Sequence, residues 1–448
     1  MRSRSLLSSL DPWNGLSELR RSPGHMSATT ITLLGNFGSH NLGNECTLQA
    51  LNVNIRRLLG DASVNCVCAD PSDTFERHHI PAVLISYRHA RDFGARRRSS
   101  NRLLRLLRRV FIRVPLELLE WFRDFKALKG TGMLIMTGTG MLGDFGIRPL
   151  GLHYEILKWS VIARLRRARV LFLSVGAGPL DHPLSRVIVK AALSLADYRS
   201  YRDHFSRQYL ATIGFDTSRD SVYPDLVFSL PGSLIPVSSP RAKTGRVVAL
   251  GLMEYYGKDC DTEKGKVVYE TYVEQVSQFA AWLLEQGYSL RLLIGDLAYD
   301  MHVRNDVYRS LRAKGIVLHP EQLTDERITS VEDLCRQLSL ADVVVATRFH
   351  NLVLALMLGK PTIALSYHEK IRSLMEEAGL GKYCHDVGGM DVPKLIQQFL
   401  TLEEDADALR SSIKGKTQEY RHALDEQYRH VLRDLLPAPA PAVRRAAS

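Results

Sequence analysis

Arg348 and His350 stand directly after a short β-branched run in the second half of the chain, Val343 to Ala346. A guanidinium group matches a carboxylate or a phosphate with two parallel hydrogen bonds, and an imidazole exchanges a proton near neutral pH. If the run is a β-strand, both side chains emerge at its carboxyl end. Arg348 would then hold an anion, and His350 would act on it as a general acid or base.

Three further residues can join such a site. Tyr367 and Lys370 follow the next apolar run, Thr362 to Ser366, and His153 precedes a predicted helix in the first half of the chain. Parallel strands present the residues that follow them at one edge of the sheet. We therefore expect Tyr367 and Lys370 beside Arg348, with His153 reaching the site from the first half.

A second arginine of interest lies in the first half of the chain. Arg202 follows the strand-like run Tyr198 to Tyr201 and precedes Asp203, which also suits a helix N-cap. Two interpretations stay open: Arg202 binds an anionic ligand, or it forms a structural ion pair with Asp203. Its place at the end of a strand favours the ligand.

Three glycine-containing loops follow apolar runs in the first half of the chain. Their candidate ligand-binding residues are Gly35, Asn36 and Asn41 in the first loop, Gly138 and Gly140 in the second, and Gly176 in the third. Glycine lets the backbone approach a ligand, and the start of a helix offers free N–H groups. Ordinary strand-to-helix turns also use glycine, so one loop alone is weak evidence. Three loops at successive strand ends favour a binding rim.

A repeating order of strand, loop and helix would position these residues. The predicted strands are 29–34, 64–69, 83–86, 133–136 and 170–175, and then 247–252, 290–294, 316–319, 343–346 and 362–366. Strands that alternate with helices form parallel sheets covered on both faces. We expect an α/β protein of two doubly wound, Rossmann-like domains that face each other across one cleft.

Length and composition set the predicted boundaries. A chain of 448 residues exceeds the size of one hydrophobic core. We expect a disordered extension at 1–28, a first domain at 29–232, a linker rich in Pro, Ser and Gly at 233–245, a second domain at 246–436 and a disordered tail at 437–448. Met26, just before the first strand, is an alternative start to Met1.

The charge balance favours anionic partners. Lys and Arg outnumber Asp and Glu by 59 to 48. Because much of this excess is local, we expect no nucleic-acid partner. The sequence contains no signal-peptide core and no apolar run of roughly eighteen residues, which predicts a cytoplasmic protein. The cysteine spacing predicts no metal site.

Much of the positive charge lies in a predicted basic insert at 96–129. Within its segment 96–113, the arginines from Arg102 to Arg113 fall on one side of a helical projection and Leu, Val and Phe on the other, and three more arginines at 96–98 precede them. Such a helix resembles an anchor on an anionic membrane surface. A helix that packs on the domain with its arginines in water would give the same pattern, and both interpretations stay open.

The order of the motifs is more specific than any one of them. They are Gly-Asn-x-Gly-x-x-Asn-x-Gly at 35, Gly-x-Gly-x-Leu at 138, Ser-x-Gly-x-Gly-Pro at 174, Arg-Asp at 202, Pro-Asp-x-x-Phe at 224, Arg-Phe-His at 348, Gly-x-Pro at 359 and Tyr-x-x-Lys at 367. In this order the chain resembles the polysaccharide pyruvyltransferase family over about residues 30–375. One departure is Asn44, which stands where the family usually has an acidic residue before Glu45.

The resemblance implies a transferase with a GT-B-like architecture and phosphoenolpyruvate as its donor substrate, without a cofactor. The acceptor would be a sugar that is nucleotide-linked, lipid-linked or polymeric. Arg202, Arg348 and His350 would lie on the phosphate and carboxylate of the donor, with His153 as a further donor-site or acid–base candidate. The product would be a pyruvyl ketal in an exopolysaccharide or other cell-surface glycan.

Two other functions stay open. A GT-B glycosyltransferase would use a nucleotide sugar and could place Arg348 on its diphosphate. A non-catalytic protein that binds a sugar phosphate or a membrane surface would keep the glycine loops without turnover. A dinucleotide-dependent dehydrogenase is disfavoured, because the first loop lacks Gly-x-Gly-x-x-Gly.

Overall fold

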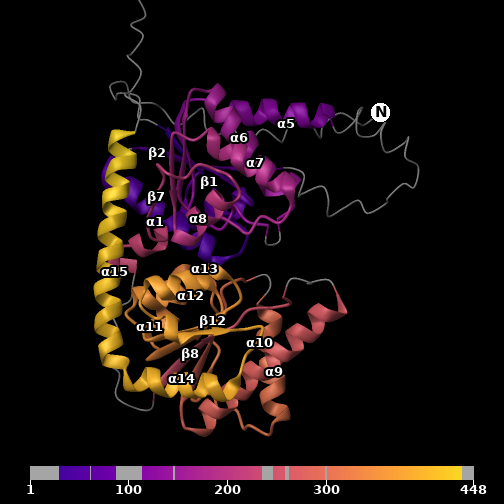
Figure 1. Cartoon of the computed structure of the whole chain (residues 1–448), viewed down its shortest axis with the longest axis vertical. Coiled ribbons are helices and arrows are strands. Elements are labelled where there is room, and N and C mark those ends of the chain that lie inside the picture. Colours follow the sequence, from indigo (N-terminus) through magenta and orange to yellow (C-terminus); the bar gives the residue numbers. More distant parts are fainter. Residues whose placement is uncertain are drawn as a thin grey trace, which may run out of the picture.

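The computed structural model describes residues 30–60, 62–86, 114–144, 147–234, 246–257, 262–297 and 300–435. They form two α/β domains stacked along the long axis of the molecule (Figure 1). The predicted extension, the arginine-rich segment 96–113, most of the linker and the tail lie outside the described residues. The two parallel-sheet α/β domains that the sequence predicts are confirmed.

The first domain contains a parallel sheet of seven strands in the order β3-β2-β1-β4-β5-β6-β7. The strands are β1 Thr30–Leu34, β2 Ser63–Cys68, β3 Ala82–Leu84, β4 Thr131–Met136, β5 Arg169–Val175, β6 Tyr198–Tyr201 and β7 Ser221–Val222. The chain first builds outward from β1 and then returns to place β4 on its other side. The crevice at this reversal of strand order is where doubly wound sheets bind ligands.

The second domain repeats this plan with six parallel strands in the order β10-β9-β8-β11-β12-β13. The strands are β8 Val247–Gly251, β9 Ser289–Leu293, β10 Leu323–Thr324, β11 Val343–Ala346, β12 Thr362–Ser366 and β13 Cys384–Asp386. The predicted strand 316–319 does not form, and β10 pairs with β9 in its place. Pro320 ends that run, because proline cannot donate to a ladder of hydrogen bonds.

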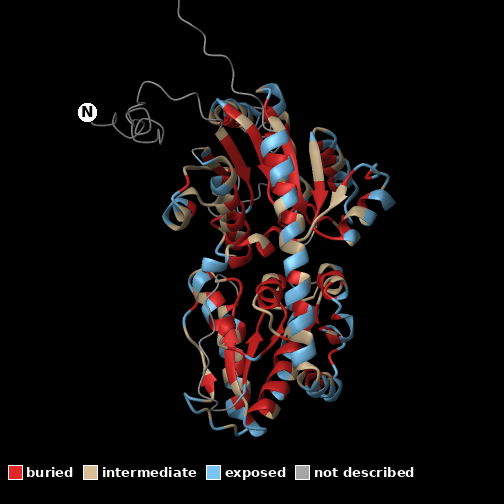
Figure 2. Ribbon diagram, turned by 90° about the vertical axis from the view of Figure 1, so that its left-hand side faces the viewer, coloured by how far each residue is buried: buried red, intermediate tan, exposed pale blue. Residues whose placement is uncertain are grey.

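Helices cover both sheets, whose strands are largely buried (Figure 2). In the first domain the helices are α1 Leu42–Leu59, α2 Pro71–His78, α5 Val114–Ala127, α6 Tyr154–Leu165, α7 Pro183–Ser194 and α8 His204–Thr212, with the π-helix η2 Pro149–His153 and the 3-10 turns η3 Leu226–Ser229 and η4 Gly232–Leu234. In the second domain they are α9 Glu263–Glu285, α10 Met301–Ala313, α11 Val331–Ser339, α12 Phe349–Met357, α13 Glu369–Glu377, η5 Gly381–Tyr383, α14 Val392–Glu404, α15 Ala406–Arg429 and η6 His430–Asp434.

The last long helix, α15, runs along one side of both domains (Figure 1). At its middle, Thr417 donates a hydrogen bond to the carbonyl of Leu356 in the second domain, at 3.2 Å. Near its end, the buried Gln427 donates to the hydroxyl of Ser200 at 2.6 Å and accepts from that of Ser174 at 3.1 Å, both in the first sheet. The final part of the predicted second domain, 246–436, therefore completes the first domain.

A buried ion cluster joins α5 to α6. The ammonium of Lys158 lies 2.8 Å from Asp124 and 2.6 Å from Glu155, and all three side chains are almost fully buried. Burial lowers the pKa of Lys158, but the two carboxylates outweigh it and the net shift is upward. The lysine is therefore charged in the folded protein, and its charge is needed to balance the two acids.

We expect Lys158→Met to destabilise the first domain by about 3 to 5 kcal/mol, because it removes the buried cation that Asp124 and Glu155 share. Lys266→Met is the control, since Lys266 and Glu263 form an exposed pair and such pairs contribute little. Thermal unfolding of both variants measures the difference. Equal midpoints for the two variants would contradict the assignment.

Candidate functional site

Arg202 emerges from the end of β6 and is buried at the seam between the domains. Its Nη1 lies 3.5 Å from Asp225 and its Nε lies 3.4 Å from Asp203, so neither contact is a short ion pair. Nε has no hydrogen-bond partner. The guanidinium stacks on the ring of Phe349 from the second domain, with its carbon 4.4 Å from the ring centroid. Arg202 therefore keeps hydrogen-bonding capacity for a ligand.

Two of the predicted glycine loops converge on Arg202. A Cβ atom at Gly176 would lie 2.7 Å from the guanidinium carbon, and one at Gly140 would lie 3.5 Å from Nη2. The guanidinium lies against the backbone because these residues have no side chains. Gly138 has another role, because its α-carbon faces the carbonyl of Ser174, to which an added Cβ would come within 2.8 Å. That position is a packing contact within the domain.

His350, in the first turn of α12, is held between the two domains. Its Nε2 lies 3.9 Å from Asp225 and has no hydrogen-bond partner. Its Nδ1 faces the first turn of α1, where a Cβ on Gly43 would come within 2.0 Å. Burial lowers the pKa of His350 to about 3, and the charges of Arg202 and Lys370 act in the same direction. The imidazole is therefore neutral in the empty site.

Asp225 is a site residue to which the sequence assigned no role. Its Oδ1 caps η3 by accepting from the N–H of Val227 at 3.0 Å, and its Oδ2 faces both Arg202 and His350. Burial raises its pKa, although Arg202 opposes the shift. In the sequence, Asp225 appears only as part of the Pro-Asp motif at 224. The spacing of that motif does not predict that Asp225 lies beside Arg202.

Lys370 adds a positive charge to the site, and the pKa of Tyr367 responds to it. The ammonium of Lys370 lies 5.2 Å from the centroid of the Tyr367 ring. Burial acts to raise the pKa of Tyr367, but the cations Lys370, Arg348 and Arg202 lower it more, so the net shift is downward. A buried phenol with a lowered pKa indicates a pocket with excess positive charge. The predicted neighbourhood of Arg202, His350, Tyr367 and Lys370 is therefore present.

Arg348 is placed differently from the prediction. Its Nε donates to Asp300 at 2.9 Å, and its Nη2 donates to the other oxygen of the same carboxylate. Asp300 is fully buried and also accepts from the N–H groups of Gly295 and Asp296 at 3.1 and 2.9 Å. The guanidinium group that we expected to bind the donor is thus hydrogen-bonded to Asp300. Arg348 fixes the loop after β9 and contributes its charge to the site.

His153 lies on the same rim but further along the second glycine loop. It is fully buried at the end of η2, and its Nδ1 is 3.8 Å from Asp144. Neither ring nitrogen has a hydrogen-bond partner. Burial lowers its pKa, although Asp144 acts in the opposite direction. Among the described residues, no contact joins His153 to Arg202 or His350.

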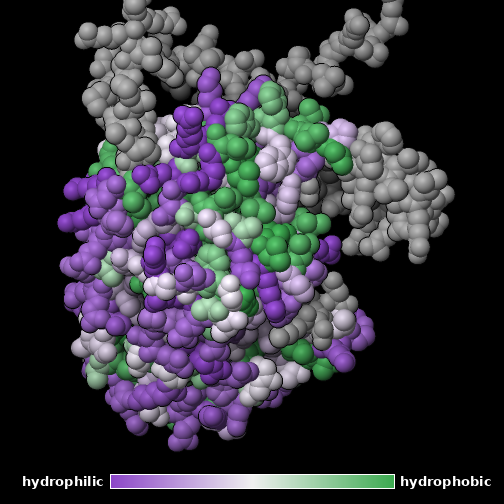
Figure 3. Space-filling model, turned by 45° about the horizontal axis from the view of Figure 1, so that its top comes forward, coloured by the Kyte–Doolittle hydropathy of each residue, from purple (hydrophilic) through white to green (hydrophobic). Residues whose placement is uncertain are grey.

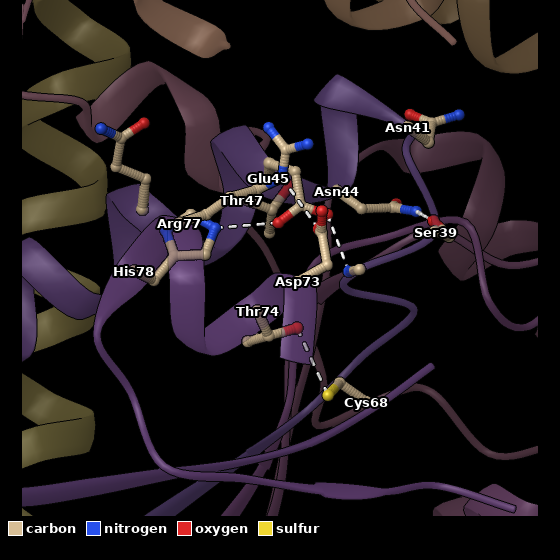
Figure 4. A network of polar contacts seen from close by, with 12 residues as sticks. Ser39, Asn41, Asn44, Glu45, Thr47, Cys68, Asp73, Thr74, Arg77 and His78 are labelled. Atoms are coloured by element: carbon tan, nitrogen blue, oxygen red, sulfur yellow. Dashed lines mark hydrogen bonds and ion pairs between the residues drawn. The ribbon is translucent and has the colours of Figure 1, made fainter. Parts of the chain in front are cut away.

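The first glycine loop is closed by its own hydrogen bonds (Figure 4). Glu45 accepts from the N–H of Gly38 at 2.9 Å and lies 2.8 Å from Nε2 of His78. Asn44 donates to the carbonyl of Asn36 at 3.0 Å and to the hydroxyl of Ser39 at 3.1 Å. Asn44, which departs from the family motif, is thus a structural part of the loop.

The residues of this loop that were expected to contact a ligand make contacts within the protein. The ring of Phe37 occupies the place of a Cβ on Gly35, and Asn36 is exposed. Asn41 caps α1 by accepting from the N–H of Gly43 at 3.0 Å, and it donates to Asp296 of the second domain at 3.1 Å. These residues shape the loop and the domain seam. The loop reaches the site through Gly43.

The residues of the site enclose little free space. A cavity of about 10 Å³ is lined by Arg202, Asp225, Phe349, Lys370, Glu377 and Tyr420, among others. This is room for about one water molecule. The seam is also closed by backbone hydrogen bonds, from Leu42 to the carbonyl of Gly295 at 3.0 Å and from Leu297 to that of His40 at 2.9 Å. A larger ligand needs the seam to open.

Two parallel-sheet domains with a polar site at their seam define a GT-B-like α/β protein, and solved structures support this class. They include the S. aureus MnaA–UDP complex (TM-score 0.58, 10% identity, 91% of this chain and 97% of that one), a UDP-N-acetylglucosamine 2-epimerase (0.58, 11%, 92% and 96%) and Anabaena Alr3699/HepE with UDP and glucose (0.52, 13%, 90% and 99%). At such identities the likeness concerns the fold alone. Comparison with curated proteins finds no match.

The sequence identifies the family. A model of the polysaccharide pyruvyl transferase family matches residues 41–369. The chain belongs to this family. The match covers most of both domains and contains Arg202, Asp225, His350 and Tyr367, while Lys370 stands one residue beyond it.

We expect His350 to stay neutral from pH 8 down to about pH 4 in the ligand-free protein, because its pKa lies at about 3. The unfolded chain takes up this proton near pH 6.5, so the contribution of His350 to stability is present above that pH and is lost as the pH falls toward 3. Histidine NMR titration, with the resonance assigned through His350→Gln, measures the ionisation. A His350 resonance that titrates near pH 6.5 in the empty site would contradict the geometry.

Proposed function

We propose that this protein is a polysaccharide pyruvyltransferase that transfers a pyruvyl group from phosphoenolpyruvate to two hydroxyls of a sugar. The observation that carries the proposal is the convergence of Arg202 and Lys370 on a neutral, unpaired His350 at the domain seam. The family supports the reaction class. The ketal product would belong to an exopolysaccharide or another cell-surface glycan, made in the cytoplasm.

The charges of the site suit the donor. Phosphoenolpyruvate carries a carboxylate and a phosphate, and these anions need cations that are not already neutralised. Arg202 lies 3.4 and 3.5 Å from its two carboxylates, and Lys370 lines the same small cavity. Arg348 acts on the donor only through its charge, because two of its nitrogens donate hydrogen bonds to Asp300. We therefore assign donor binding mainly to Arg202 and Lys370.

The negative charge of the bound donor can raise the pKa of His350 and so make it an acid. Arg202 and Lys370 lower the pKa of His350 in the empty site, in addition to burial. A bound dianion offsets these two charges, so the pKa rises and His350 takes up a proton. His350 then delivers the proton to the methylene carbon of the donor, and Asp225, 3.9 Å away, favours the imidazolium that precedes this step.

The remaining steps follow from the balance of the reaction. Protonation of the methylene leaves an oxocarbenium-like carbon, which the first sugar hydroxyl attacks, and its proton passes to the now neutral His350. The carbon–oxygen bond to phosphate then breaks as His350 returns its proton to the leaving phosphate, and the second hydroxyl attacks the same carbon to close the ketal and gives its own proton to His350. Phosphate leaves with the electron pair of that bond. Arg202 and Lys370 stabilise the departing dianion.

A glycosyltransferase that uses a nucleotide sugar is the second candidate. Its support is the fold, since solved neighbours were determined with UDP. The same experiment separates the two functions. Incubation with phosphoenolpyruvate and a panel of sugar acceptors should release phosphate and add a pyruvyl mass to the acceptor. Turnover of a UDP-sugar, with neither of these signals, would favour the glycosyltransferase.

We expect Arg202→Gln and His350→Gln each to lower pyruvyl transfer by about 10²- to 10⁴-fold, because they remove a charge from the donor site and the acid–base group. Arg372→Gln is the control, since Arg372 is 42% exposed and pairs with Glu369 outside the site. The assay compares initial rates of phosphate release, with thermal midpoints measured in parallel. Normal rates in both site variants would remove this assignment.

We expect Gly43→Ala to lower the rate by about 10²-fold, because a Cβ at this position would collide with His350, and small misplacements of a catalytic group have costs of this size. Gly415→Ala in α15 is the matched control, since a Cβ there meets no atom within 4 Å. A fully active Gly43→Ala enzyme would show that the ring of His350 need not lie against α1.

A further inference from the structure

Helix α5 exposes three large apolar side chains and buries two of its acids. Leu118, Leu119 and Phe122 are 65%, 63% and 58% exposed, whereas Glu120 and Asp124 are 6% and 1% exposed. A helix on the surface of a soluble domain normally does the reverse. Hydrophobic side chains gather on the upper part of the first domain, where α5 lies (Figures 1 and 3).

Polar contacts on the inner side fix this orientation. Asp124 lies 2.8 Å from the buried ammonium of Lys158. The hydroxyl of Tyr154 donates to Glu117 at 2.5 Å and accepts from the indole of Trp121 at 3.1 Å. Turning α5 to bury its leucines would break all three contacts. The outward apolar face is therefore built into the packing of the domain.

The surroundings of this face are cationic. The ammonium of Lys126 stands 4.4 Å from the centroid of the Phe122 ring, and the exposed Lys129 follows at the end of the helix. The sequence that leads into α5, residues 93–116, contains eight arginines and no acidic residue. An apolar strip flanked by lysines, in a part of the sequence rich in arginine, matches the boundary of an anionic bilayer, where acyl chains and phosphates lie together.

We propose that α5 lays its apolar face on an anionic lipid surface and holds the protein there. None of the described helices is long and apolar enough to cross a bilayer, so the contact is with the surface. A second copy is a poorer occupant of this face, because a symmetric contact would bring the lysines of two α5 helices together. The inference does not depend on the reaction, since lipid binding needs no donor or acceptor.

The test is co-sedimentation of the full chain with phosphatidylcholine vesicles, with and without phosphatidylglycerol. We expect binding that requires phosphatidylglycerol and weakens with added salt. The triple substitution Leu118→Ser, Leu119→Ser and Phe122→Ser should lower the partition coefficient at least about tenfold, because each side chain loses its apolar transfer free energy. Lys126→Glu with Lys129→Glu should weaken binding to the anionic vesicles as well.

The matched control removes three exposed apolar side chains from the second domain, by Val267→Ser, Val317→Ser and Leu400→Ser. This variant should bind like the wild type. Absence of wild-type binding to either vesicle, or equal binding by the α5 and control variants, would overturn the proposal. Sedimentation velocity without lipid completes the test, since a wild-type dimer that the α5 substitutions dissociate would assign the face to a second copy instead.

Discussion

The site depends on an electrostatic imbalance at the domain seam. Arg202 is buried with its nitrogens 3.4 and 3.5 Å from the carboxylates of Asp203 and Asp225, and Lys370 adds a second cation to the same cavity. Burial, together with the charges of Arg202 and Lys370, lowers the pKa of His350 and keeps the imidazole neutral. The nearby cations also lower the pKa of Tyr367 against the effect of burial. In the proposed reaction the dianionic donor neutralises the charges of Arg202 and Lys370. Binding of the donor and protonation of His350 are therefore coupled.

The two sheets create this imbalance by meeting at their carboxyl edges. β6 delivers Arg202 from the first domain, and the turn after β11 delivers His350 from the second. The first turn of α1 then closes on the ring of His350, which a side chain at Gly43 would prevent. Each domain alone holds half of the site, and the geometry exists only when the seam is formed.

Much of this arrangement could be read from the sequence, because it follows local rules. Alternating strands and helices gave the two parallel sheets, and residues directly after strands gave Arg202 and His350. Contacts between distant segments could not be read in this way. The pairing of Arg348 with Asp300, the link from Asn41 to Asp296 and the place of Asp225 under Arg202 depend on how the loops fold toward each other. Asn41 looked like a ligand contact because capping residues and binding residues share the same side chains.

The path of α15 has a consequence for the order of folding during synthesis. Gln427 fills a buried position against Ser174 and Ser200, and Tyr428 meets the hydroxyl of Ser229 at 3.0 Å. These partners precede the helix residues that cover them by 253, 227 and 199 residues in the chain. The first domain therefore emerges from the ribosome with part of its sheet uncovered, and it acquires its full native surface only after the whole second domain has been made.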